Sequence, residues 1–203
     1  MILRKRFFCF VHLALMLPWL CIAPKATPKP RTNAQQNPPL VQALLDWARA
    51  NNPQHYQFAL DRGVQIGVTA DQRSFYLVWY PTTQASLPAE KRSLIVTMHG
   101  SNGNAFTEFF LWYNSAQQHN QGVLALQWYF PANAPPNDYY LPAESYAALS
   151  AALTAQSLKP GRALLHGFSR GSANSYYVTL FDRLSGNHFF ALSIANSGGA
   201  STD

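Results

Sequence analysis

Cysteine is nearly absent from this 203-residue chain, and the two that occur, Cys9 and Cys21, lie within the first 26 residues. The part from Thr27 onward has no thiol, which excludes disulfides and cysteine-based metal sites there. It also has no glycine-rich loop followed by lysine, the pattern that cradles phosphate groups. The sequence therefore predicts neither a metal site nor a cofactor, and a fold stabilised by its core alone.

Charge is also scarce, at 12% of residues, although the formal net charge is +6. Four cations lie in the first 26 residues, where there is no acid: Arg4, Lys5, Arg6 and Lys25. From Thr27 onward 11 Lys and Arg stand against 9 Asp and Glu, which leaves a net charge of +2. No basic stripe remains to follow a phosphate backbone, so nucleic acid is excluded as a partner.

Residues 1–26 have the order of a secretory signal peptide: a positive stretch, the 17-residue run Phe7 to Ala23, and small residues that offer a cleavage position. A retained N-terminal anchor is the main alternative, because the apolar run is close to the length that spans a bilayer. Lipidation at Cys21 is a weaker one, since a bulky leucine precedes it. We expect a secreted or periplasmic protein with no other membrane contact. A Pro-rich linker at 27–39 leads to a domain at 40–203.

Apolar strand patterns alternate with amphipathic helix patterns along this domain. Helices are expected at residues 40–50, 106–119, 142–158 and 169–184, and strands at 74–80, 93–98, 122–130, 162–166 and 189–195. Continuous apolar strands alternating with helices predict the α/β class, with a mostly parallel sheet covered by helices on both faces. Functional side chains are then expected at the carboxyl ends of the strands.

The run Gly167-Phe168-Ser169-Arg170-Gly171 matches G-x-S-x-G between a predicted strand and a predicted helix. Serine on such a tight turn holds its hydroxyl clear of the sheet, and the glycines allow the helix to approach the strand. Ser169 is the predicted nucleophile, and the backbone N–H of Arg170 is a predicted donor to an oxyanion. The alternative is a glycine-rich turn with a helix-capping serine.

A second polar turn follows the predicted strand at 93–98, beginning with His99 and Gly100. Two N–H donors are needed because a tetrahedral intermediate concentrates its charge on one oxygen. We expect the second donor to be the amide of Ser101, with Asn102 as the next candidate. His99 is expected to hold this loop by hydrogen bonding. Neither His99 nor His166, which lies along a buried strand, is favoured as the catalytic base.

Aromatic side chains are frequent in the segments expected around the serine. Three of them are predicted to contact the substrate: Phe106, Trp128 and Tyr129. Aromatic side chains at strand ends form the apolar walls of many binding pockets and stack on acyl groups or sugar rings. Ordinary core packing is the alternative for these residues.

With these two motifs in this order, residues 58–199 resemble the α/β-hydrolase superfamily. The chain is most similar to its secreted esterase branch, which includes polyhydroxybutyrate depolymerase-like and feruloyl or acetyl-xylan esterase-like proteins. The resemblance implies a serine hydrolase that acts on small-molecule or polymer carboxylic esters through an acyl-enzyme. Peptidase or amidase activity on the same fold, and a non-catalytic hydrolase-like binding protein, stay open as alternatives.

In that superfamily the triad runs Ser, then Asp or Glu, then His. The last histidine of this chain, His188, precedes the final predicted strand, so no base stands where the family pattern requires it. Asp203 would match only a rarer position of the acid. We therefore expect a C-terminally truncated domain, with its acid and base beyond residue 203. Alone, such a chain is expected to be weakly active or inactive.

Overall fold

The computed structural model describes residues 37–133 and 135–198. The predicted signal peptide, most of the linker and Asp203 lie outside these residues. Along the chain the helices are α1 (Pro39–Asn51), α2 (Pro53–Asp61), α3 (Thr82–Ala85), the 3-10 helix η1 (Ala89–Lys91), α4 (Ala105–Gln118), α5 (Pro142–Ala155) and α6 (Arg170–Leu184). The strands are β1 (Gln65–Val68), β2 (Phe75–Trp79), β3 (Leu94–Met98), β4 (Gly122–Leu126), β5 (Ala163–Phe168) and β6 (Phe190–Asn196).

The six strands form one sheet in the order β1-β2-β4-β3-β5-β6. The pairs β4–β3, β3–β5 and β5–β6 are parallel, whereas β1 and β2 join at one side as antiparallel strands. The chain order departs from the spatial order at β3 and β4, so the carboxyl ends of β3 and β5 become neighbours. This is the edge of the sheet where the two motifs of the sequence meet.

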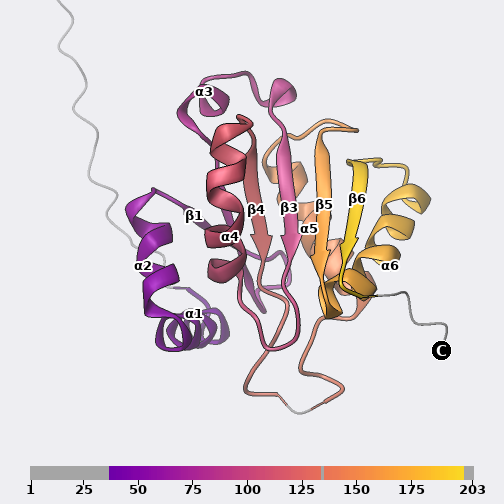
Figure 1. Cartoon of the computed structure of the whole chain (residues 1–203). Coiled ribbons are helices and arrows are strands. Elements are labelled where there is room, and N and C mark those ends of the chain that lie inside the picture. The colour runs from indigo at the N-terminus through magenta and orange to yellow at the C-terminus, as the bar shows by residue number, and fades with distance from the viewer. Residues whose placement is uncertain (1–36, 134, 199–203) are drawn as a thin grey trace, which may run out of the picture. The chain divides into compact units, whose positions relative to one another are not determined.

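Helices cover both faces of this sheet. In Figure 1, α4 lies in front of the sheet, and α5 and α6 lie behind it. Helix α4 packs against β2, β3 and β4, and α6 packs against β3, β5 and β6. The predicted α/β architecture, mostly parallel with helices on both faces, is therefore confirmed. None of the helices in the described ranges is long and apolar enough to cross a membrane.

The structure differs from the sequence-based expectation at several places, which include the short helices α3 and η1 and the end of α5 at Ala155. Strand β4 ends at Leu126 rather than near residue 130, because the Gln127 side chain accepts from Ala105 N–H and donates to the carbonyl of Tyr129, which turns the chain away from the sheet. Helix α2 and strand β1 were not predicted. Asn52 caps α2 by accepting from His55 N–H, and a proline follows at its first position.

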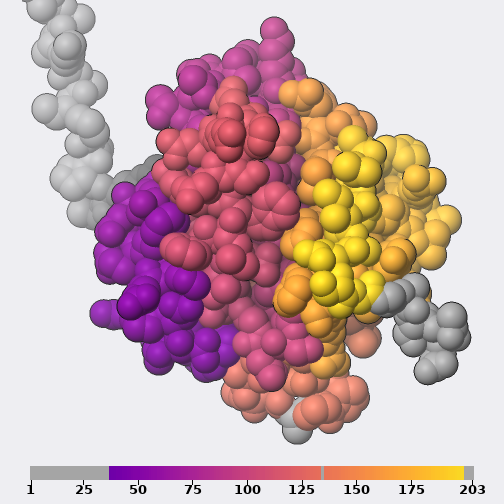
Figure 2. Space-filling model, viewed as in Figure 1, coloured from indigo at the N-terminus to yellow at the C-terminus, as the bar shows by residue number. Residues whose placement is uncertain are grey.

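Strand β6 is an edge strand with apolar side chains in solvent. Leu192 is 55% exposed and Ile194 is 39% exposed. Ile194 pairs with His166 of β5, whose ring contacts Trp112 of α4, so it belongs to the face on which α4 lies. Figure 2 shows β6 reaching the surface beside α4, with no described helix over it. This part of the sheet lacks a covering layer among the described residues.

Candidate active site

Ser169 occupies the turn between β5 and α6. Its backbone has φ 51° and ψ −114°, a conformation that costs a non-glycine residue about 1–3 kcal/mol. The turn is held by Ser169 N–H, which donates to the carbonyl of Asn196 at the end of β6 over 2.8 Å. The residue is half-buried, and its strained backbone is the geometry that a G-x-S-x-G elbow requires.

The two glycines of this motif are places of close backbone approach. A Cβ on Gly167 would overlap the carbonyl oxygen of Gly171 one turn away. A Cβ on Gly171 would lie 2.6 Å from the carbonyl oxygen of His99, and closer still to that of Met98. The start of α6 is therefore in direct backbone contact with the end of β3, which brings the serine beside the second motif.

The loop after β3 lies directly against Ser169. A methyl group placed on Gly100 would be 3.3 Å from Ser169 Cβ. Residues 100–103 form a β-turn in which Gly103 N–H donates to the Gly100 carbonyl over 3.2 Å, and Asn102 has φ 57° at its third position. The predicted oxyanion donor Ser101 is thus the second residue of a turn in contact with the predicted nucleophile.

The first four N–H groups of a helix have no partner within it, and Arg170 is the first residue of α6. Within the described residues, neither the Arg170 amide nor the Ser101 amide makes a hydrogen bond. The Asn102 amide, the next candidate, is already engaged: it donates to Tyr139 Oη over 2.8 Å. The geometry therefore favours Ser101 over Asn102 as the donor from this loop.

His99 is fully buried beneath this turn. Its Nδ1–H donates to the Gly100 carbonyl over 2.8 Å, which leaves Nε2 to accept from Trp128 N–H at 3.5 Å. Burial lowers the pKa of His99 to about 4, so the ring is neutral at physiological pH. Trp128 closes the arrangement, because its indole N–H donates to the His99 carbonyl over 3.1 Å. His99 holds the loop, as its place in the sequence suggested.

Tyr139 joins the two motifs. Its hydroxyl accepts from the Asn102 amide, and its ring lies under the guanidinium of Arg170, 3.8 Å from the ring centroid. Its neighbour Tyr140 is buried and donates to the carboxylate of Asp71 over 2.8 Å, which fixes this stretch of chain to the turn between β1 and β2. No sequence pattern marked Tyr139 for this role, because the residues it connects are far apart along the chain.

A cavity of about 300 Å³ opens beside the elbow, and its lining includes Arg170, Tyr139 and Trp128. Of the three predicted substrate contacts, only Trp128 lines it. Tyr129 is half-buried between the rings of Trp47 and Tyr139, outside this lining. Phe106 is 0% exposed in the core, so its prediction as a substrate contact is wrong. The helical phase of α4 turns that side chain inward against Phe75 and away from Ser169.

The His166 side chain lies on the face of β5 that α4 covers, opposite the face that α6 covers. Its Nδ1 accepts from Trp112 Nε1–H at 3.3 Å and lies 3.2 Å from Thr97 Oγ1, which in turn donates to Glu108. Burial lowers the pKa of His166 and raises that of Glu108, which favours the neutral form of both. Among the described residues no hydrogen bond joins a histidine to Ser169 Oγ, and no group of three or more His, Cys, Asp or Glu side chains is arranged to hold a metal ion.

No protein-family model and no curated protein sequence matches the chain. Solved structures do. The thermostable carboxylesterase EstE1, from a metagenomic library, aligns with TM-score 0.52 and 16% identity over 75% of this chain and 53% of its own. An esterase from the archaeon Pyrobaculum calidifontis gives TM-score 0.52 and 14% identity over 77% and 56%.

The ester hydrolase EH1AB1 from the metagenome of Lake Arreo aligns with TM-score 0.53 and 17% identity, over 83% of this chain and 62% of its own. The chain thus spans between half and two thirds of the length of these three proteins. At such identities the likeness concerns the fold. The strand order, the mixed sheet and these alignments together show that the chain has the α/β-hydrolase fold.

Proposed function

We propose that this chain carries the nucleophile of a serine hydrolase that cleaves carboxylic esters. The observation that supports this most directly is the contact between two segments distant in sequence. The strained, half-buried Ser169 lies against Gly100, at a distance of 3.3 Å from a methyl group placed there. A capping serine in a glycine-rich turn would need neither the strained backbone nor this neighbour.

In the proposed reaction Ser169 Oγ attacks the ester carbonyl carbon while its proton passes to a general base. The carbonyl oxygen takes up negative charge, and the amides of Ser101 and Arg170 stabilise it, each worth about 3 kcal/mol of the barrier. The tetrahedral intermediate collapses with loss of the alcohol, which receives the proton from the base. Water then cleaves the acyl-enzyme by the same steps.

The acid and the base are proposed to come from sequence beyond residue 203, in the order Asp and then His. The coverage of 53% and 62% of two similar esterases supports this proposal. So does the open edge of the sheet, because further strands and a helix against β6 would bury Leu192 and Ile194. Asp203, outside the described residues, is the alternative position for the acid.

The substrate is proposed to be an extracellular ester, as in the polyhydroxybutyrate depolymerase-like and feruloyl or acetyl-xylan esterase-like proteins that the sequence resembles. The predicted signal peptide supports export. The 300 Å³ cavity beside the elbow, lined by Trp128, Tyr139 and apolar neighbours, suits an apolar or aromatic acyl group.

The test compares the 203-residue chain with a longer protein read through in frame beyond the Asp203 codon, by about 80–120 residues. We expect no steady-state hydrolysis of p-nitrophenyl butyrate by the former and saturable turnover by the latter. In the longer protein Ser169→Ala should lower kcat by at least about 10⁴-fold. Ser86→Ala, which removes an exposed hydroxyl on another part of the surface, is the matched control and should have no effect.

Saturable turnover by the 203-residue chain that disappears in Ser169→Ala would contradict the proposed absence of the base. Full activity of the longer Ser169→Ala protein would contradict the nucleophile. A panel of matched esters and amides completes the test. Faster cleavage of the amides would identify the protein as a peptidase or amidase instead of an esterase.

A further inference from the structure

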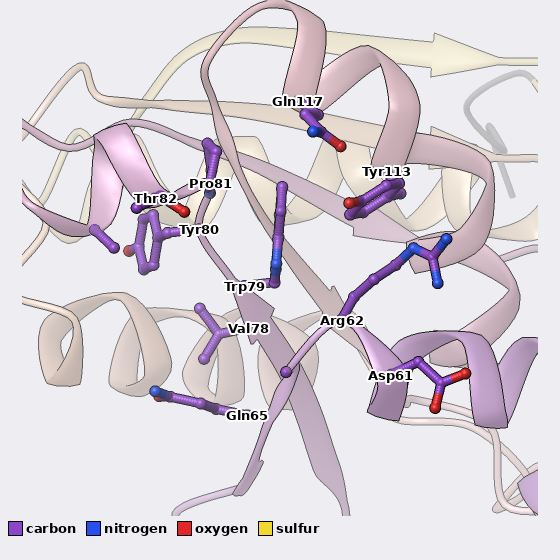
Figure 3. Close-up of a pocket in the computed structure, with 12 residues that line it drawn as sticks. Asp61, Arg62, Gln65, Val78, Trp79, Tyr80, Pro81, Thr82, Tyr113 and Gln117 are labelled. Atoms are coloured by element: carbon purple, nitrogen blue, oxygen red, sulfur yellow. The ribbon is translucent and has the colours of Figure 1, made fainter.

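A second cavity, of about 460 Å³, lies where β2 ends and α4 passes over it, and the proposed hydrolysis makes no use of it. Three aromatic side chains line it: Trp79, Tyr80 and Tyr113. Five polar side chains join them: Asp61, Arg62, Gln65, Thr82 and Gln117. In Figure 3 the indole of Trp79 stands at the centre of the lining, between Tyr80 on one side and Tyr113 with Arg62 on the other.

Two buried polar atoms of this lining, Tyr80 Oη and Arg62 Nε, have no hydrogen-bond partner among the described residues. Buried polar atoms are almost always paired, so two unpaired ones behind the same lining set this cavity apart, although neither atom is itself exposed to it. Both side chains are held in place. The Arg62 guanidinium lies 3.4 Å from the ring centroid of Phe58, and Tyr80 packs against Gly122. Burial raises the pKa of Tyr80 to about 12, so its hydroxyl keeps its proton at neutral pH.

We propose that this cavity binds a neutral oligosaccharide. The C–H faces of a sugar ring pack on the electron-rich face of an aromatic ring, and Trp79 is fixed for this by Tyr113, 4.8 Å away between ring centroids. Sugar hydroxyls both donate and accept hydrogen bonds, which matches the exposed amides of Gln65 and Gln117.

The charges of the lining argue for a neutral ligand. One carboxylate, that of Asp61, accompanies one guanidinium, that of Arg62, so the cavity has no excess of either sign. The Arg62 guanidinium is also occupied by ring contacts, 3.4 Å from the Phe58 centroid and 4.9 Å from that of Tyr113. An anion site would instead require several free cationic donors directed at one point.

The two cavities lie at opposite ends of the sheet. Trp79 pairs with Val123 at the beginning of β4, whereas Met98 at the end of β3 pairs with Gly167 beside the elbow. Val123 pairs with Ile95 of β3, three residues before Met98, so the two positions are about 10 Å apart along the strand direction. The sugar would therefore bind away from the reacting bond, as a docking site for a polymer. This inference does not depend on the proposed ester hydrolysis.

The experiment measures binding of xylohexaose, cellohexaose and maltohexaose to the full chain carrying Ser169→Ala, by isothermal titration calorimetry. We expect saturable binding of at least one hexasaccharide. Trp79→Ala should weaken it by about tenfold, the equivalent of one lost stacking contact. Gln117→Ala should weaken it several-fold, while Gln118→Ala, an exposed glutamine one position along α4 and outside the lining, should leave it unchanged.

Gln117 is exposed on its helix, so its substitution tests the site without disturbing the core even if Trp79→Ala fails to fold. Absence of binding for all three hexasaccharides would overturn the proposal. So would binding that Gln117→Ala and Gln118→Ala leave equally intact. Saturation by inorganic phosphate or benzoate, with no response to the sugars, would assign the cavity to an anion instead. Because Ser169→Ala is present throughout, none of these outcomes depends on the nucleophile.

Discussion

Acidification should destabilise the protein through His99. The pKa of a free histidine is about 6.5, and burial lowers that of His99 to about 4. Below pH 6.5 His99 becomes protonated in the unfolded chain but stays neutral in the folded chain. The free energy of unfolding therefore decreases as pH falls towards 4. The difference of about 2.5 pKa units corresponds to about 3 kcal/mol in total, of which about 2 kcal/mol is lost by pH 5. This is a large share of the stability of an ordinary domain.

The assay is urea unfolding at pH 8 and pH 5 for the wild type and for His99→Asn, whose amide keeps a donor for the Gly100 carbonyl but does not titrate. The pH 8 value gives the packing cost of the substitution alone. The wild type should then lose about 2 kcal/mol more than the variant on going to pH 5. His166 acts in the same direction and Glu108 in the opposite one, but both remain in the variant and cancel in the comparison. Equal losses in the two proteins would refute the reasoning.

Three further predictions concern the loop, its tyrosine and the sheet edge. Ser101→Pro removes an amide N–H at a turn position that accepts proline, so kcat of the longer protein should fall by about 10²–10³, whereas Ser101→Ala should leave kcat unchanged. Equal kcat values for the two variants would exclude the Ser101 amide as an oxyanion donor. Tyr139→Phe leaves the Asn102 amide unpaired, which should lower the free energy of unfolding in urea by about 1–3 kcal/mol and also lower kcat/KM. An unchanged urea midpoint would contradict this prediction. Ile194→Lys should reduce aggregation of the 203-residue chain, measured by light scattering. Its melting temperature should not fall, because the Ile194 side chain is 39% exposed. Unchanged aggregation would show that the β6 edge does not cause it.

Much of the fold could be predicted because the buried strands are short apolar runs that end in recognisable motifs. Strand β3 stops at His99-Gly100, and β5 stops at the elbow, as the alternation of strands and helices indicated. Strand β1 was not predicted because it is a short strand at the edge of the sheet, and its residues are only partly buried. Its sequence pattern is correspondingly weak.

The candidate site was predictable in part. The structure brings Ser169, the Ser101 turn and the first amide of α6 together, although their catalytic roles remain predictions. Phe106 follows the loop closely in sequence, which favours a place near the serine, but the helical spacing of Phe106, Phe109 and Tyr113 puts it on the inward face of α4. Tyr139 lies in one of the aromatic segments expected around the serine, but no sequence pattern indicated that it joins the two motifs.

Tyr139 also has a consequence for how the site responds to change. The two proposed oxyanion amides follow two different strands, β3 and β5. Their spacing therefore changes when one strand shifts relative to the other. A single side chain anchored outside β3 and β5 contacts both segments, through the Asn102 amide and the Arg170 guanidinium. Their separation then depends on this side chain as well as on the direct pairing of β3 with β5. Substitutions at the far strands should therefore alter stability well before they alter the geometry offered to an oxyanion.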